Sequence, residues 1–262
     1  MNVTDFGRRL SYAQSTQHRT PAANTRISQR RDEQRWVQVS TNTCPMKIIL
    51  FGASRGTGLY AARLAAEFGH EVTAVARTIS PAQFGNGAAQ AGHAGIRVIH
   101  GDVLKPSTFE NEIPGKDVVI SSIGVSNTRP TTLYSRGTTN IIAAMLKYNV
   151  PRLICVSGVG VEVTPGMSLP MKALTKFLVQ PLLRNNFQDL LKMEHVVKQS
   201  DLNWTIVRAP RLTNGRQVER YRYAAKDYLR NPLTISRSDL AHFIVTNIDN
   251  SACFCSRVEV AY

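Results

Sequence analysis

Three glycines follow an apolar run near the start of the hydrophobic part of the chain. Residues 50–59 read LFGASRGTGL, with glycines at 52, 56 and 58 ahead of a helix-like stretch. In a strand–turn–helix unit, Gly52 permits the tight turn, Gly56 a close backbone approach to a pyrophosphate, and Gly58 close packing of the helix on the strand. The helix N-terminus adds unpaired N–H groups and partial positive charge. The loop therefore predicts a dinucleotide-binding site; the alternative is a turn that needs glycine for its dihedral angles alone.

From Met46 onward, short β-branched runs alternate with longer amphipathic stretches, which is typical of repeated βαβ units. The near-continuous apolarity of the short runs indicates strands buried on both faces of a parallel sheet. We therefore predict a Rossmann-type doubly wound α/β sheet with three αβα layers. The predicted strands are residues 47–51, 71–76, 96–101, 117–124, 152–158, 203–209 and 257–262, and the predicted helices are 58–69, 106–113, 132–149, 187–200 and 236–248.

The carboxyl-terminal third carries two further signals. Ser236 and Asp239 have the spacing of a capping box, which predicts the start of the last helix. Residues 210–235 are polar, Arg-rich and irregular. A mixture of basic and aromatic residues begins just before them and favours a substrate-covering loop that accepts anionic ligands, although such a mixture can also bind nucleic acid. Its cations are Arg208, Arg211, Arg216, Arg220, Arg222, Lys226 and Arg230.

The first 45 residues differ from the rest of the chain. They hold seven arginines, no lysine and three acidic residues, with little apolar periodicity. We expect a disordered extension on a domain spanning residues 46–262. The segment is either an organellar transit peptide, which would imply a mitochondrial or plastid protein, or an overextended start upstream of Met46, which would imply a cytoplasmic one. A nucleic-acid-binding arm is a third alternative, weakened by the scarcity of aromatic residues.

The net charge and the cysteine content indicate which ligands and partners the protein binds. The net charge of +14 favours anionic ligands such as phosphates. The four cysteines lack the spacing of a zinc site, so we expect no metal. No apolar stretch approaches the roughly 20 residues that span a bilayer. We expect a small-molecule substrate, a monomer or homodimer, and neither a nucleic-acid nor a membrane partner.

The end of the second predicted strand indicates which dinucleotide is bound. NAD sites usually place an acidic residue there to accept the ribose 2′-hydroxyl, whereas this chain has Arg77 and Thr78. Arg55, inside the glycine loop, is a second guanidinium within reach. Paired arginines suit a 2′-phosphate, so we predict NADP(H). The alternative for either arginine is a solvated surface charge.

These motifs together resemble the short-chain dehydrogenase/reductase superfamily. Within it, the chain is similar to the atypical NAD(P)H-binding branch that contains biliverdin IXβ reductase/flavin reductase and NmrA-like proteins. The resemblance covers residues 46–262. It is carried by GASRGTG at 52–58, VAR at 75–77, GDV at 101–103, SSIG at 121–124, CVSG at 155–158 and MEHVVKQSDLNWTIVRAPRL at 193–212.

The resemblance implies a set of cofactor contacts. Asp102 and Val103 would border the adenine, with Asp102 accepting from the exocyclic amine, and Ser157 would lie near the nicotinamide. The segment RAPRL, residues 208–212, would line the nicotinamide and substrate pocket. The full set of expected cofactor residues is Gly52, Ser54, Arg55, Gly56, Thr57, Gly58, Arg77, Thr78, Asp102, Val103, Ser122, Gly124 and Ser157.

The usual catalytic pair of the superfamily is missing. Its orthodox members protonate or deprotonate the substrate oxygen with a Tyr-x-x-x-Lys pair. This chain has no such spacing, and the position about thirteen residues beyond Ser157 is Pro170. Ser157 and Arg211 remain as candidate catalytic residues. Ser157 could hydrogen-bond a carbonyl or carboxamide, and Arg211, which stands where flavin-reductase relatives have histidine, could anchor an anion.

Two functions remain open. One is an NADPH-dependent reductase whose acceptor is a flavin, a quinone or another conjugated molecule that needs little acid catalysis. The other is a non-catalytic NADP(H) sensor of the NmrA-like kind. Both explain the missing tyrosine.

Overall fold

The computed structural model describes residues 44–84 and 95–262. The expectations for the N-terminal extension concern residues 1–45. Of these, only residues 44 and 45 belong to the described part of the chain. Within that part, no helix combines the length and the apolarity needed to cross a bilayer.

A mixed eight-stranded sheet forms the centre of the fold, in the order β3-β2-β1-β4-β5-β6-β10-β8. Every neighbouring pair is parallel except β10 and β8. The strands are β1 Lys47–Phe51, β2 Glu71–Ala76, β3 Ile96–His100, β4 Val118–Ser121, β5 Arg152–Gly158, β6 Asn203–Ala209, β8 Arg222–Ala225 and β10 Ser256–Ala261.

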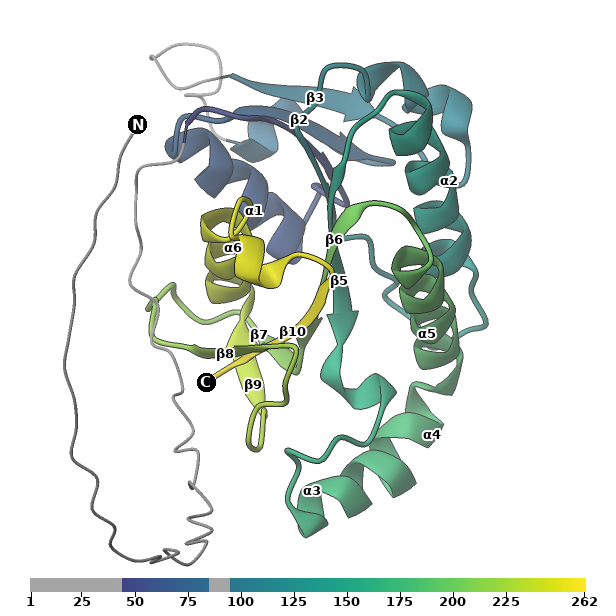
Figure 1. The fold of residues 1–262 in the computed structure, drawn as a ribbon, viewed down its shortest axis with the longest axis vertical. Helices are drawn as coiled ribbons and strands as arrows, with labels where there is room; N and C mark the ends of the chain where they lie inside the picture. Colours follow the sequence, from purple (N-terminus) through teal and green to yellow (C-terminus); the bar gives the residue numbers. More distant parts are fainter. Residues whose placement is uncertain (1–43, 85–94) are drawn as a thin grey trace, which may run out of the picture. The chain divides into compact units, whose positions relative to one another are not determined.

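Helices cover both faces of this sheet (Figure 1). Helices α1 (Gly56–Glu67) and α6 (Arg237–Thr246) lie on one face, and α2 (Leu133–Lys147) and α5 (Arg184–Lys198) on the other. Successive side chains of a strand point to opposite faces. Accordingly, Ile48 and Leu50 of β1 belong to the core under α1 and α6, while Ile49 and Phe51 belong to the second core. The predicted three-layer Rossmann-type fold is confirmed.

Two stretches differ from the prediction. Residues 210–235 were expected to be irregular, yet they contain β7 (Arg211–Thr213) and β8 and lead into β9 (Thr234–Ser236), which pairs with β7. These strands are short and only partly apolar, so they lack the pattern of a buried strand. The predicted helix at 106–113 is instead two 3₁₀ turns, at Pro106–Thr108 and Glu110–Glu112.

A helical segment that the sequence pattern did not predict follows β5. It consists of α3 (Leu169–Leu174), a π-helical stretch (Thr175–Val179) and α4 (Gln180–Leu182). Further single 3₁₀ turns lie at Pro81–Phe84, Val159–Val161 and Ser251–Cys253.

The predicted capping box is present and forms part of a larger junction. Ser236 Oγ accepts a hydrogen bond from the Asp239 N–H at 2.9 Å, as an N-cap side chain does. The fully buried Asp239 carboxylate also accepts from the N–H groups of Val218 and Glu219 and from the hydroxyl of the C-terminal residue, Tyr262. One side chain thus ties the start of α6 to a loop and to the chain end.

Replacing Asp239 with alanine leaves those buried donors without an acceptor. Asp239→Ala is expected to lower the free energy of unfolding by about 3 kcal/mol. Urea unfolding followed by circular dichroism measures the loss, with Asp249→Ala as the control because Asp249 is an exposed aspartate. Equal unfolding midpoints for the two variants would contradict this role.

Candidate cofactor and substrate site

The glycine loop is a point of close backbone contact. Gly52 has φ +83°, and a Cβ there would lie 2.4 Å from the carbonyl oxygen of Ser122. A Cβ on Gly58 would lie 2.3 Å from the carbonyl oxygen of Gly52. Gly56 has φ +58°, in the left-handed region that favours glycine. The loop therefore brings the start of α1 against the ends of β1 and β4.

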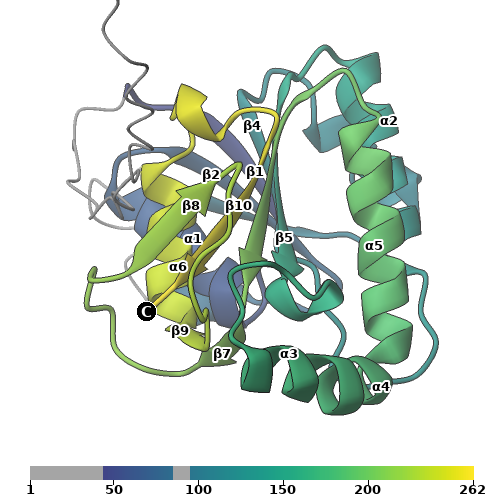
Figure 2. The same ribbon diagram turned by 60° about the horizontal axis from the view of Figure 1, so that its bottom comes forward.

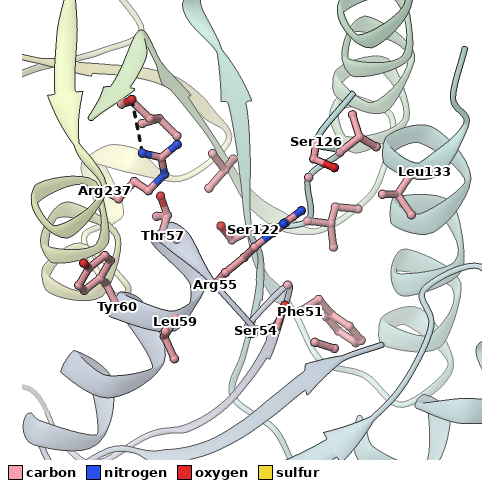
Figure 3. A pocket seen from close by; sticks show the side chains of 18 of the residues that line it. Phe51, Ser54, Arg55, Thr57, Leu59, Tyr60, Ser122, Ser126, Leu133 and Arg237 are labelled. Carbon is pink, nitrogen blue, oxygen red and sulfur yellow. Dashed lines mark hydrogen bonds between the residues drawn. The ribbon is translucent and has the colours of Figure 1, made fainter. Parts of the chain in front are cut away.

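A cavity of about 1350 Å³ opens beside this loop (Figure 3). It lies at the carboxyl ends of β1, β2, β4, β5 and β6, where strand order reverses between β1 and β4 and where open α/β sheets bind ligands. Gly58 is buried behind the loop and does not line the cavity. The other expected cofactor residues all line it: Gly52, Ser54, Arg55, Gly56, Thr57, Arg77, Thr78, Asp102, Val103, Ser122, Gly124 and Ser157.

The floor of the cavity presents donors suited to an anion. The first turn of α1 contains no acidic residue, and its N-cap residue, Arg55, makes no side-chain capping bond. Thr57 Oγ1 is buried and has no hydrogen-bond partner among the residues that the structure describes. Unpaired backbone N–H groups, the helix dipole and an unpartnered hydroxyl fit the pyrophosphate of a dinucleotide.

Arg237 is a site residue that the sequence did not reveal. It is the first residue of α6, and its Cδ would lie 3.3 Å from a Cβ on Gly56. Its guanidinium donates to Asn214 Oδ1 at 2.7 Å and to the Leu212 carbonyl. The side chain therefore lies over the glycine loop (Figure 3). No local motif marks it, because the contact joins segments about 180 residues apart in the sequence.

The two arginines predicted to select NADP(H) line the same region. Arg55 and Arg77 are exposed, and both also line a second cavity of about 350 Å³ together with the segment at 124–127. Two guanidinium groups at one cavity produce a local positive potential. Nearby, Asp102 Oδ1 accepts a hydrogen bond from the Leu104 N–H at 3.0 Å, which orients the carboxylate.

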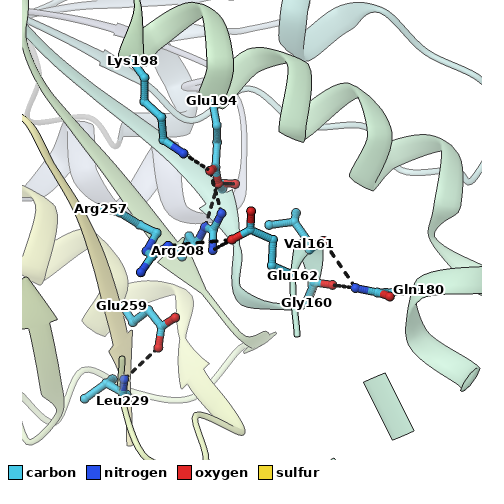
Figure 4. Close-up of polar contacts among 11 residues, drawn as sticks. Gly160, Val161, Glu162, Gln180, Glu194, Lys198, Arg208, Leu229, Arg257 and Glu259 are labelled. Carbon is cyan, nitrogen blue, oxygen red and sulfur yellow. Dashed lines mark hydrogen bonds and ion pairs between the residues drawn. The ribbon is translucent and has the colours of Figure 1, made fainter. Parts of the chain in front are cut away.

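Ser157 lies at the other end of the cavity and is hydrogen-bonded to a buried carboxylate. Its hydroxyl donates to Glu194 Oε1 at 2.8 Å. Arg208 Nε and Nη2 donate to the two oxygens of Glu194 at 2.8 and 2.7 Å (Figure 4). Burial alone raises the pKa of Glu194, but the bidentate contact with Arg208 outweighs it, so the pKa lies below its ordinary value. An ionised carboxylate only accepts, so the Ser157 proton points to Glu194 and the oxygen lone pairs remain for a donor in the cavity.

Arg208 is a structural residue. It is fully buried, and its third nitrogen donates to Glu162 Oε2 at 2.8 Å. The expectation that Arg208 belongs to an anion-binding cover is therefore wrong, because its guanidinium is already paired with two carboxylates. Arg257, whose guanidinium lies 4.3 Å from the Tyr228 ring centroid, is a further cation near Glu162 (Figure 4).

Arg211 does not reach the cavity. Its side chain is exposed on β7, whereas the next residue, Leu212, lines the cavity. Adjacent side chains of a strand point in opposite directions, so a shift of one residue separates the two positions. The prediction of a catalytic Arg211 is not supported by this placement.

Apolar side chains and one phenol also line the cavity. Val156, Leu190, Pro210 and Leu212 line it. Tyr134 lines the cavity as well, and its hydroxyl accepts from the Val125 N–H at 3.2 Å. Burial raises the pKa of this phenol.

The chain shares its fold with solved nucleotide-binding proteins. A short-chain dehydrogenase/reductase from Veillonella parvula in complex with NADP is 20% identical, with 84% of this chain and 95% of that one covered and a TM-score of 0.67. A proposed NADH-flavin reductase from Streptococcus pneumoniae is 20% identical, with 82% and 99% covered and a TM-score of 0.61. ChuY, an anaerobillin reductase from Escherichia coli O157:H7, is 21% identical, with 82% and 96% covered and a TM-score of 0.62.

The family itself follows from the sequence match. A family model described as NAD(P)H-binding matches residues 52–251, from the first glycine of the loop to the turn before β10. This span includes the glycine loop, the strand ends around the cavity and the Ser157–Glu194–Arg208 contacts. The chain belongs to the NAD(P)H-binding family of Rossmann-fold proteins.

Proposed function

We propose that the protein is an NADPH-dependent reductase that transfers hydride to a flavin-like, quinone or other conjugated acceptor. The observation that carries the proposal is the cavity of about 1350 Å³ that extends from Arg77 to Leu212. It exceeds the range of roughly 300–1000 Å³ typical of single-ligand pockets. A dinucleotide and a second planar molecule therefore have room side by side.

Each part of the cavity has a distinct task in this proposal. The first turn of α1, Thr57 and Arg237 bind the pyrophosphate, and Arg55 and Arg77 bind the 2′-phosphate by charge-assisted hydrogen bonds. Ser157, as an acceptor, orients the carboxamide N–H₂ of the nicotinamide. The nicotinamide, when bound, supplies the hydride. The protein supplies orientation and keeps the acceptor against the donor carbon.

The lining favours an acceptor that needs little acid catalysis. Among the described residues that line the cavity there is no histidine, cysteine, lysine or glutamate, and the raised pKa of Tyr134 makes that phenol a weak acid. Reduction of a conjugated acceptor takes up one hydride and one proton, and water can provide the proton. The apolar surface of Val156, Leu190, Pro210 and Leu212 suits a planar ring system.

The reaction can be tested with a panel of acceptors. Purified protein is mixed with NADPH and FMN, riboflavin, quinones or biliverdin, and the nicotinamide absorbance is followed. We expect NADPH oxidation with at least one acceptor. Binding of NADPH without oxidation of any of them would overturn the reductase and support the alternative, a non-catalytic NADP(H) sensor.

Cofactor preference is tested by reversing one charge. Arg77→Asp is expected to weaken NADPH binding by about 2 kcal/mol, because it removes a charge-assisted contact, and to leave NADH binding nearly unchanged. Calorimetric titration with both cofactors measures the difference. Arg230→Asp is the matched control, since Arg230 is an exposed arginine that follows β8 at the opposite edge of the sheet. Equal wild-type affinity for NADH and NADPH would refute the preference.

The role of Ser157 can be separated from a packing role. Ser157→Ala is expected to slow hydride transfer and weaken NADPH binding by about tenfold, the equivalent of one hydrogen bond. Ser121→Ala is the control, because Ser121 is a buried serine at the end of β4 whose hydroxyl has no partner. Single-turnover absorbance measures the step. If Ser157→Ala behaved like Ser121→Ala, the orienting role would be excluded.

A further inference from the structure

The helical segment after β5 exposes an unusual amount of apolar surface. We call residues 169–182, which comprise α3, the π-helical stretch and α4, the apolar arm. Figure 2 shows α3 and α4 at one end of the fold, beyond the end of α5. Five large apolar side chains of the arm are between 51% and 81% exposed: Leu169, Leu174, Phe177, Leu178 and Leu182.

The arm has an inner face that is anchored and an outer face that is not. Gln180 Nε2 donates to the carbonyl oxygens of Gly160 and Val161 at 3.2 and 3.4 Å (Figure 4). The buried Thr175 hydroxyl contacts Met167 Sδ at 3.8 Å. Leu174, Leu178 and Leu182 are exposed whereas Thr175 is buried, so these leucines lie on the side of the arm away from its anchored face. The arm is therefore amphipathic with its apolar face toward solvent.

The sequence of the arm and its flanks is basic. Lys172 and Lys176 lie within the arm and Arg184 follows it, while no aspartate or glutamate occurs between Glu162 and Asp189. Lys176 Nζ lies 5.7 Å from the Phe177 ring centroid, so charge and apolar surface are adjacent. A helix with Leu and Phe on one face and lysines beside them has the composition of a segment that lies in a membrane interface.

We propose that the apolar arm docks the protein on the surface of an anionic lipid bilayer. Apolar side chains would enter the boundary of the acyl chains, while Lys172, Lys176 and Arg184 contact the headgroups. The net charge of +14 adds a long-range attraction. A second copy of the chain fits less well, because pairing two arms would bring their lysines together with no acid to offset them. Docking in the interface needs no membrane-spanning helix, and this proposal differs from the expectation, drawn from the sequence, of no membrane partner.

The position of the arm also indicates the chemical class of the hydride acceptor. This step rests on the proposed reductase function. The arm follows the carboxyl end of β5, where Ser157 and Gly158 line the cavity. A Cβ on Gly160 would lie 3.0 Å from Phe187 and 3.6 Å from Val179, so the arm packs directly beside this strand end. A docked arm would place the acceptor end of the cavity close to the bilayer. The class of acceptor is then a lipid-dissolved quinone.

Vesicle flotation tests the docking with the full chain. The vesicles contain phosphatidylcholine alone or phosphatidylcholine mixed with phosphatidylglycerol. The wild type is expected to bind the mixed vesicles, more weakly as salt is raised. Combining Phe177→Ser with Leu178→Ser is expected to reduce binding by about tenfold or more. Combining Lys172→Gln with Lys176→Gln is expected to have an effect of about the same size.

The control is Leu146→Ser, because Leu146 is half-exposed on α2 and adjacent to Lys147. All variants retain the Arg-rich first 45 residues, so a difference in vesicle binding between an arm variant and the wild type is caused by the substitutions in the arm. Thermal melting and NADPH oxidation with a water-soluble acceptor should be unchanged in the arm variants. These readouts show that the variants fold.

Three results would overturn the docking proposal. The wild type could fail to bind the mixed vesicles, or the Phe177→Ser/Leu178→Ser variant could bind as well as the wild type. Light scattering could instead show that the wild type is a dimer and this variant a monomer. The arm would then be a contact between two copies of the chain. Vesicle binding without turnover of any acceptor would overturn only the reductase function and leave docking intact.

Discussion

Close backbone contact at two glycines determines where everything else in the site lies. The Gly52 turn packs on the carbonyl of Ser122, and the helix carrying Gly58 packs on the carbonyl of Gly52. A side chain at Gly52 would push the turn away from the end of β4, and one at Gly58 would push α1 away from the turn, because each added Cβ would lie far inside van der Waals distance of a backbone carbonyl. Because of this contact, the first turn of α1, which includes Thr57, borders a cavity that is also lined by the ends of β4 and β5.

A second constraint holds the opposite end of the cavity. Arg208 and Glu194 are both buried and make a bidentate pair between β6 and α5. A buried ion pair adds little net stability compared with apolar packing, but removing one partner leaves an uncompensated charge. The pair also sets the orientation of the Ser157 hydroxyl, because the ionised Glu194 accepts a hydrogen bond from it. The pair thus converts a serine that could donate or accept into an acceptor at the place expected for the nicotinamide.

The sequence predicted what depends on local pattern and missed what depends on distant contacts. The buried strands were visible as apolar β-branched runs, and the capping box at Ser236 was visible as a motif of two residues. The sequence does not show that Arg208 is buried and paired, because its carboxylate partners lie on other elements, and it does not mark Arg237 for the same reason. Arg211 was misplaced by a single position on a strand too short to show alternation. The apolar arm exposes most of its large apolar side chains, so it lacks the periodicity of an ordinary core-facing helix.

The proposed function requires that a single cavity hold NADP with its 2′-phosphate at the arginines and its nicotinamide at Ser157. A crystal structure of the protein with NADP⁺ tests this most directly. We expect a pyrophosphate within hydrogen-bond distance of Thr57 Oγ1, a 2′-phosphate between Arg55 and Arg77, and a carboxamide nitrogen donating to Ser157 Oγ. A cofactor bound in the reverse direction, or outside the cavity, would contradict it.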